Sequence, residues 1–150
     1  GTGVKSDRRE MPEEMPLHLE AGTGNEPSYH GLLAALRWTA ENPLKKEKME
    51  EILEYLKESL EKLGCRVIRP KPPVTPVVSF TVPGWHPGDA GDILSGSYDI
   101  ICRTGLHCSP MIMENLGMEE GTIRLSLSRF TEKADADRVL EAVAAMRESH

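Results

Sequence analysis

The change of hydrophobic period at Gly64 constrains the fold of this chain more than any other feature of its sequence. From Met49 to Leu63 apolar residues recur at helical spacing, and Glu and Lys cover the opposite face, which is typical of an amphipathic helix with a solvated charged side. Gly64 is placed to cap the C-terminus of this helix. After Gly64, short runs rich in β-branched residues replace the helical pattern. The chain therefore joins a helical part to a part that contains strands.

Four short segments after Gly64 have the composition or the alternation of β-strands. They are residues 65–69, 77–82, 98–103 and 123–128. The third segment is apolar enough to be buried on both faces. In the fourth, Ile123, Leu125 and Leu127 alternate with polar residues, as in a half-buried strand.

Two further helices are expected in this part of the chain. A short one covers residues 90–94, and a last one is capped by Thr131. The apolar stripe of the last helix is Ala136, Val139, Leu140, Val143 and Met146. This order predicts an α+β domain in which helices pack on one face of a small, antiparallel or mixed sheet.

Residues 1–30 are polar and rich in turn-forming residues, with no sustained period. We expect an extended arm or interface segment here, because ordered loops of this length usually lie against another surface. Helical spacing from Tyr29 to Glu41 predicts a helix that Asn42-Pro43 ends. The predicted organisation is an arm over 1–30 and one small domain over 31–150. Since the chain begins with Gly1 and not with methionine, we expect it to be processed, trimmed or cut from a longer protein.

The composition fits one globular domain and excludes several functions. A chain of 150 residues can close one hydrophobic core. Its 18 Lys+Arg and 24 Asp+Glu give a net charge of −6, which offers no general attraction to nucleic acid or anionic lipid. Without a membrane-length apolar stretch or a signal-peptide pattern, a cytoplasmic protein is expected. Three cysteines with no C-x-x-C pair argue against a disulfide framework or a structural zinc site.

Reactive groups gather in the loop Arg103-Thr104-Gly105-Leu106-His107-Cys108-Ser109-Pro110. Cys108 is the candidate nucleophile, because an adjacent histidine, a nearby arginine and a following helix N-terminus each favour a thiolate. The alternative is that Cys108 only packs the loop and that His107 is a partly exposed neighbour. Cys65 and Cys102 lie in strand patterns, where cysteine behaves as a small buried apolar residue.

Arg124 lies on the polar face of a predicted strand, where its planar guanidinium suits a carboxylate ligand. The alternative is a surface ion pair with one of the many glutamates. The glycine–threonine turns at residues 1–3 and 20–25 offer backbone N–H groups to a phosphate, but neither has the spacing of a nucleotide-binding loop. Zinc bound by His86, His107 and Cys108 lacks a recognisable fourth ligand, so no metal is expected.

Several of these segments together resemble one known family. They are Gly1-Thr2-Gly3, Glu20-Ala21-Gly22-Thr23-Gly24-Asn25, Arg103 to Pro110, and Gly121-Thr122-Ile123-Arg124-Leu125-Ser126. In order and spacing they are similar to the C-terminal part of class V pyridoxal-phosphate aminotransferases, and most of all to cysteine desulfurases of the SufS-like branch and selenocysteine lyases. The resemblance implies the C-terminal small domain of a fold-type I pyridoxal-phosphate enzyme.

The resemblance also implies roles for individual residues. Cys108 matches the nucleophile that takes sulfur from a cysteine–pyridoxal adduct and holds it as a persulfide. Arg124 matches the arginine that binds the substrate carboxylate, and Arg103 matches another substrate-site arginine. Thr2 matches a threonine that reaches the cofactor phosphate across a homodimer interface. The substrate is then L-cysteine or selenocysteine, and a protein is expected to accept the sulfur.

Two residues are expected beside this site, and two positions depart from the family pattern. His107 precedes the nucleophile as in the family, and its part in proton transfer is left open. Asn25 ends the second glycine–threonine motif. Gly24 stands where proline is common, and Ser109 where alanine is common.

The family's Schiff-base lysine, which follows a histidine, has no counterpart among the eight lysines of the chain. The chain is therefore expected to be a fragment that binds no pyridoxal phosphate covalently and that is inactive in isolation. Two alternatives stay open. One is a freestanding, non-catalytic module that carries sulfur or binds a protein. The other is a class V aminotransferase or lyase with a different substrate.

Overall fold

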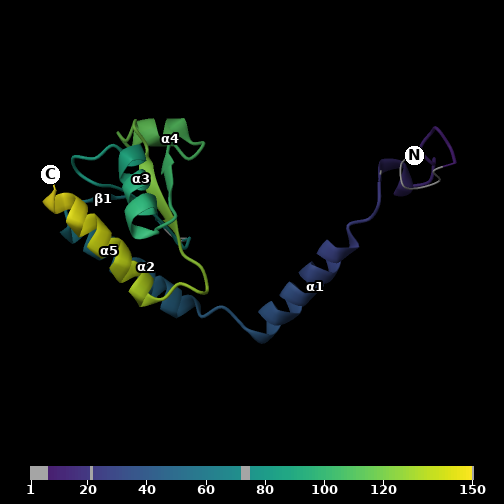
Figure 1. The fold of residues 1–150 in the computed structure, drawn as a ribbon, viewed down its shortest axis with the longest axis horizontal. Helices are drawn as coiled ribbons and strands as arrows, with labels where there is room; N and C mark the ends of the chain where they lie inside the picture. The colour runs from purple at the N-terminus through teal and green to yellow at the C-terminus, as the bar shows by residue number, and fades with distance from the viewer. Residues whose placement is uncertain (1–6, 21, 72–74, 150) are drawn as a thin grey trace. The chain divides into compact units, whose positions relative to one another are not determined.

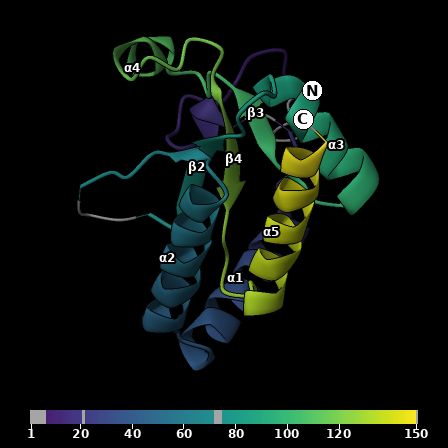
Figure 2. The ribbon, with the colours of Figure 1, turned by 90° about the vertical axis from the view of Figure 1, so that its left-hand side faces the viewer.

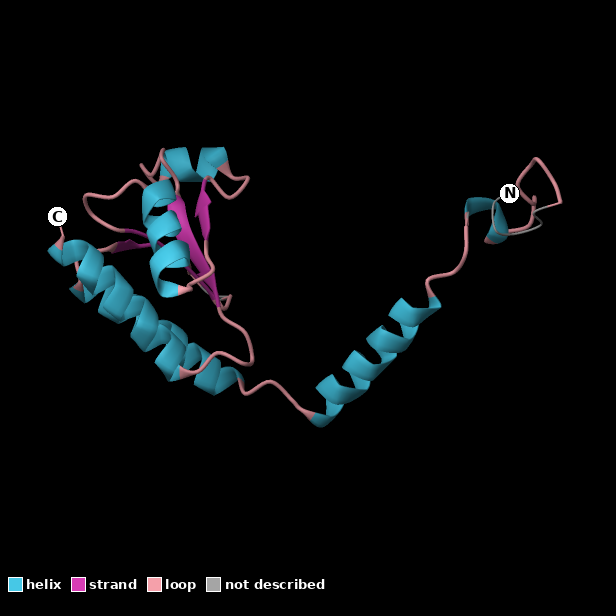
Figure 3. Ribbon diagram, in the orientation of Figure 1, coloured by secondary structure: helices cyan, strands magenta, loops and turns pink. Residues whose placement is uncertain are grey.

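The computed structural model describes residues 7–20, 22–71 and 75–149. The chain divides into two compact units, residues 1–44 and 45–150, and each is described by itself. The first holds a short 3-10 helix, Leu17–Leu19, and α1, Glu26–Glu41 (Figure 3). The division after Leu44 falls later than the expected one after residue 30, which lies inside α1.

Helix α1 confirms the predicted helix and begins three residues before Tyr29, at Glu26. It ends at Glu41, and Asn42 donates both its backbone N–H and its side-chain amide to the carbonyl of Trp38. None of its residues is buried, although its apolar side chains recur at helical spacing. Leu32 and Leu36 are 57% and 59% exposed.

The second unit contains a four-stranded sheet. Its strands are β1 (Arg66–Val67), β2 (Val77–Thr81), β3 (Arg103–Gly105) and β4 (Thr122–Ser126). Their order is β1-β2-β4-β3, and each neighbouring pair is antiparallel. β4 lies at the centre beside β2 and β3, so it connects the edge strand β3 to the rest of the sheet.

Three helices cover one face of this sheet (Figures 1 and 2). They are α2 (Lys46–Lys62), α3 (Pro87–Tyr98) and α5 (Lys133–Glu148). α2 contacts β1 and β2, α3 contacts β3 and β4, and α5 contacts both helices. The predicted α+β architecture, with helices on one face of a small antiparallel sheet, is confirmed.

The core between the helices and the sheet follows the predicted periodicities. Its largest fully buried apolar side chains are Leu53, Leu60, Val78, Phe80, Leu94, Ile123 and Val143. Val78 and Phe80 point to the same face of β2, and their cross-strand partners Leu125 and Ile123 do so on β4. The alternation predicted around Ile123 is therefore correct.

The C-terminus of α2 matches the prediction from Gly64. Gly64 has φ +84, and its N–H donates to the carbonyl of Glu61. The next N–H, that of Cys65, donates to the carbonyl of Leu60. These two bonds form a Schellman motif, which satisfies carbonyls that the helix end leaves without partners.

The strand predicted over residues 98–103 is wrong. Helix α3 extends to Tyr98, well beyond the expected 90–94, and Asp99 then adopts a left-handed conformation with φ 53. The N–H of Ile100 donates to the carbonyl of Leu94, which closes the helix and places Ile100 in the core. Ile101 is 92% exposed, and β3 begins only at Arg103.

Two helix starts depend on side chains that the sequence pattern did not identify as caps. His86 is the N-cap of α3 and accepts a hydrogen bond from the N–H of Gly88. In α5 the N-cap is Glu132 and not the predicted Thr131, because Glu132 and Asp135 form a reciprocal capping box. Thr131 instead accepts a hydrogen bond from the N–H of Ser128.

Candidate active site

The candidate nucleophile lies at the tip of a tight turn that follows β3. The N–H of Ser109 donates to the carbonyl of Leu106 at 2.9 Å, and the two central residues, His107 and Cys108, have φ values of 53 and 60. Positive φ at both central positions is the mark of a type I′ turn, which usually takes glycine or asparagine there. Two side-chain-bearing residues in this conformation indicate that other contacts hold the turn. Cys108 is exposed.

Arg103 supplies one of these contacts. Its Nη2 donates a hydrogen bond of 3.2 Å to the Sγ of Cys108. Because Arg103 is the first residue of β3, the turn folds back so that Cys108 meets the strand from which it came. A guanidinium in this position stabilises negative charge on sulfur.

A second arginine lies beside the first on the face of the sheet opposite the helices. Arg124 on β4 pairs across the strands with Arg103 on β3 and with Ser79 on β2. Arg124 is half-buried, and its Nε has neither solvent access nor a hydrogen-bond partner among the described residues. The ion pairs found in the described ranges do not include Arg124, so the alternative of a glutamate partner finds no support there. An unpaired guanidinium of this kind is suited to an anionic ligand.

His107 joins the turn to the strand that carries Arg124. Its Nε2 and the Oγ1 of Thr122 share a hydrogen bond of 2.8 Å, and Thr122 is fully buried. The Nδ1 of His107 is buried and has no partner in the described part of the chain. Burial lowers the pKa of His107, and the positive charges of Arg124 and Arg103 lower it further, while interaction with the backbone of Thr122 opposes this.

Gly121 allows β4 to approach the start of the turn closely. Its φ is +86, and a Cβ at this position would lie 2.2 Å from the carbonyl carbon of Gly105. Gly105 is the last residue of β3 and pairs with Thr122. Any larger residue at 121 would separate Thr122 from the turn that it contacts through His107.

Comparison with protein families identifies the origin of this arrangement. The family model for aminotransferase class-V matches residues 3–139. This chain belongs to the class V aminotransferase family. The match spans parts of both units and contains all of the site residues described above.

Individual relatives of the class V chain are cysteine desulfurases. It is 32% identical over 134 residues to the cysteine desulfurase CsdA of Escherichia coli, covering 87% of this chain and 32% of that protein. It is 31% identical over 144 residues to a probable cysteine desulfurase of Pyrococcus abyssi, covering 91% and 35%. The class V chain therefore spans about a third of the length of these relatives.

Solved structures show the same fold. The apo structure of the cysteine desulfurase of Thermococcus onnurineus NA1 matches the class V chain with a TM-score of 0.78 and 28% identity, over 90% of this chain and 34% of that one. The crystal structure of CsdA from Escherichia coli matches with a TM-score of 0.76 and 30% identity, over 89% and 33%.

The other two cysteines of this protein lie in different environments from Cys108. Cys65 is buried, as predicted, and burial raises its pKa to about 11. Cys102 is only half-buried, because the strand expected around it does not form. Burial also raises the pKa of Cys102, and the Asp92 carboxylate raises it further.

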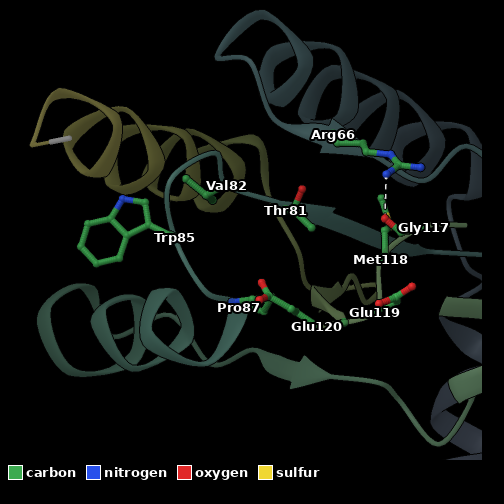
Figure 4. Close-up of a pocket in the computed structure, with 10 residues that line it drawn as sticks. Arg66, Thr81, Val82, Trp85, Pro87, Gly117, Met118, Glu119 and Glu120 are labelled. Atoms are coloured by element: carbon green, nitrogen blue, oxygen red, sulfur yellow. Dashed lines mark hydrogen bonds between the residues drawn. The ribbon is translucent and has the colours of Figure 1, made fainter. Parts of the chain in front are cut away.

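A cavity of about 380 Å³ lies elsewhere in the class V chain, between the N-terminus of α3 and the loop before β4 (Figure 4). Arg66, Trp85, Glu119 and Glu120 are among its lining residues. The guanidinium of Arg66 already has hydrogen-bond partners within the protein, since it donates to the carbonyls of Leu116 and Gly117. Cys108 and Arg124 do not line this cavity, so we place the candidate site at the turn and the polar face of the sheet.

The fold brings only some of the predicted site residues together. Arg103, His107, Cys108 and Arg124 converge within one unit. Asn25 is the N-cap of α1 in the other unit, and its place in the site stays a prediction. Thr2 lies outside the described residues. Within the described ranges, no three His, Cys, Asp or Glu side chains gather to hold a metal ion, and no helix is long and apolar enough to cross a membrane.

Thr122 is the site residue that sequence reasoning missed. The motif Gly121-Thr122-Ile123-Arg124 contains it, but nothing in the motif alone assigns it a role. It lies two positions before Arg124, and alternate residues of a strand share a face. The alternation of the strand therefore indicates that Thr122 shares a face with Arg124. The sequence does not indicate that the turn with His107 folds against this face.

Proposed function

We propose that this chain is the sulfur-accepting part of a cysteine desulfurase, in which Cys108 takes sulfur from L-cysteine. One observation carries the proposal: an exposed thiol at the tip of a constrained turn receives a hydrogen bond from Arg103, and Arg103 is the cross-strand neighbour of Arg124. A nucleophile in the turn after β3 and a carboxylate-binding cation on the adjacent strand β4 suit an amino-acid substrate that carries a thiol. Its cysteine desulfurase relatives agree with this choice of reaction.

The roles follow from the chemistry of each group. Arg124 binds the substrate carboxylate, because none of the ion pairs found in the described residues gives it a protein carboxylate. Arg103 holds the Sγ of Cys108 and stabilises the negative charge of the attacking thiolate and of the persulfide that follows. This second role adds to the substrate-binding role that the family resemblance implies for Arg103.

The proposed reaction moves one sulfur atom. A bond forms between the Sγ of Cys108 and the sulfur of the substrate, and the bond between that sulfur and the substrate's β-carbon breaks. The electron pair of the broken bond stays with the carbon, which is protonated to give alanine. The two sulfurs are oxidised to the persulfide level and the carbon is reduced, so no external oxidant or reductant is needed.

Pyridoxal phosphate, when bound, supplies the electron sink that makes this carbon–sulfur bond labile. The described residues do not fit its attachment, because no lysine lies on β3, on β4 or in the turn that follows β3. Lys57 is buried and paired with Glu54, and Lys133 is paired with Asp137. We therefore propose that the cofactor lysine belongs to a part of the protein outside these 150 residues.

The setting of the complete protein follows the same proposal. The exposure of Cys108 suits delivery of the persulfide sulfur to an acceptor protein. We expect a homodimer in which Thr2 contacts the cofactor phosphate of the other subunit, and a cytoplasmic location. Selenocysteine is the alternative substrate.

The test replaces Cys108 in the complete polypeptide that contains this sequence, loaded with pyridoxal phosphate. Cys108→Ala is expected to reduce sulfide release from L-cysteine at least about 100-fold and to leave the cofactor absorbance spectrum unchanged. Cys102→Ala is the matched control and is expected to keep the activity. Full sulfide release by Cys108→Ala would refute the assignment of the nucleophile. A complete native polypeptide of only 150 residues that carries a stable persulfide would instead favour the freestanding sulfur carrier.

A further inference from the structure

We propose that His107 is a positioning residue that holds the Cys108 turn against β4 through Thr122, and not the proton donor or acceptor of the reaction. The part of this inference that concerns the reaction deepens the proposed function and rests on it. The placement of the turn itself is a property of this chain and can be measured without the cofactor.

The turn requires an anchor of this kind. His107 and Cys108 both have positive φ, a conformation that costs side-chain-bearing residues free energy. The backbone bond from Ser109 to Leu106 alone does not determine where the turn lies relative to β4. The bond between His107 Nε2 and Thr122 Oγ1 does, because Thr122 is fully buried within the sheet.

Neither nitrogen of the His107 ring is free to exchange a proton with a substrate. Nε2 is occupied by the Thr122 hydroxyl at 2.8 Å. Nδ1 is buried and has no solvent access. A general acid or base must reach the reacting atom directly or through a water molecule. The ring is therefore placed to support the turn.

The charges around the ring lead to the same conclusion. The cations near His107 are Arg103 on β3 and Arg124 on β4, and both oppose its protonation. The neighbouring titratable group in the turn is the Cys108 thiol. A neutral imidazole adds no positive charge beside the two arginines. A protonated ring would add a third cation to the proposed substrate-binding face of the sheet.

Two pairs of variants test the anchor in the 150-residue chain. Thr122→Val removes the hydroxyl and keeps the shape, whereas Thr122→Ser keeps the hydroxyl. His107→Asn tolerates positive φ, but its amide is too short to reach Thr122. His107→Gln can place an amide group where Nε2 lies. Circular dichroism verifies that each variant is folded.

The readout is the amide hydrogen exchange of Ser109, whose N–H closes the turn. We expect exchange to accelerate roughly 2- to 10-fold in Thr122→Val and His107→Asn, as for loss of one neutral hydrogen bond, and to change little in Thr122→Ser and His107→Gln. Unchanged exchange in Thr122→Val would overturn the inference, because the bond would not hold the turn.

The same variants in the complete, cofactor-loaded polypeptide separate positioning from proton transfer. Positioning predicts that kcat falls in Thr122→Val and His107→Asn with little change in KM, that His107→Gln restores it, and that the pH profile stays the same. Loss of one limb of the pH profile in both His107 variants, with Thr122→Val fully active, would show proton transfer and overturn the inference. An inactive wild-type protein would refute the proposed function, while the exchange data would still decide whether His107 anchors the turn.

Discussion

Arg103 on β3 and Arg124 on β4 are direct cross-strand partners, and Arg124 alternates along β4 with Ile123 and Leu125, which face the core. Like charges opposite each other in a sheet are unfavourable, and Arg124 has no ion pair in the described ranges to offset this. The pair reduces the stability of the sheet and prepares an anion-binding site. A bound carboxylate would relieve the repulsion.

This relationship predicts opposite effects of one substitution on stability and on binding. Arg124→Gln is expected to raise the free energy of unfolding of the 150-residue chain by about 0.2–1 kcal/mol, because the repulsion with Arg103 is removed. In the complete polypeptide the same change is expected to raise the KM for L-cysteine at least about 10-fold, since the bidentate carboxylate contact is lost.

Urea unfolding and steady-state kinetics measure these two effects. Ser79→Ala, at the neighbouring cross-strand position, is the control and is expected to leave KM unchanged. A destabilised Arg124→Gln chain would contradict the repulsion, and an unchanged KM would contradict the carboxylate role.

The three cysteines are expected to differ in reactivity. At pH 8, roughly one Cys65 thiol in a thousand is ionised if its pKa is about 11. Cys108 is exposed, so iodoacetamide is expected to modify Cys108 first, Cys102 more slowly and Cys65 last. Peptide mass spectrometry after timed quenching gives the three rates. In about 8 M urea the differences should disappear, because unfolding exposes all three thiols. Modification of Cys65 before Cys108 in the folded chain would contradict the burial of Cys65.

Gly121 is expected to tolerate no side chain. Gly121→Ala combines an unfavourable positive φ with a Cβ placed 2.2 Å from the backbone of Gly105, so we expect a loss of at least about 2 kcal/mol in unfolding free energy. Gly96→Ala on α3 is the matched control. It has open space and no positive φ, and it is expected to be neutral or to stabilise the chain by up to about 1 kcal/mol. Equal effects of the two changes in thermal unfolding would contradict the close approach of Gly121 to Gly105.

The lowered pKa of His107 predicts a dependence of stability on pH. The unfolded chain binds a proton at this histidine near its usual value of 6.5, whereas the folded chain binds it only at lower pH. The unfolded state therefore gains protons first, and His107 makes the folded state less stable as the pH falls below about 6.5. Above that range it has no such effect.

His107→Gln tests this dependence because it cannot be protonated. The difference in unfolding free energy between the wild type and His107→Gln is expected to be constant above about pH 7.5 and to move in favour of the variant between about pH 6.5 and 5. Urea titrations across this range measure it. A difference that moves in favour of the wild type would mean that the folded state raises the pKa of His107.

Local patterns predicted the elements whose residues interact with near neighbours in the sequence. The stripe from Met49 to Leu63 and the cap at Gly64 are satisfied within α2 itself, and the alternation around Ile123 follows from the two faces of β4. The strand predicted over residues 98–103 is wrong, because the apolar residues of this segment suit a buried strand as well as they suit the end of a helix and the loop after it. The left-handed turn at Asp99 and the continuation of α3 decide its structure, and neither has a strong local signal.

The sequence alone determined the α+β composition, the identity of the reactive loop and the resemblance to class V enzymes, because periodicity and residue order carry this information. Only the tertiary structure decided that Arg103 contacts Cys108, that His107 contacts Thr122, and that the two arginines are cross-strand neighbours. These contacts join residues on different strands or across a turn. Their geometry depends on strand register and on the close approach of Gly121 to Gly105, which no local pattern specifies.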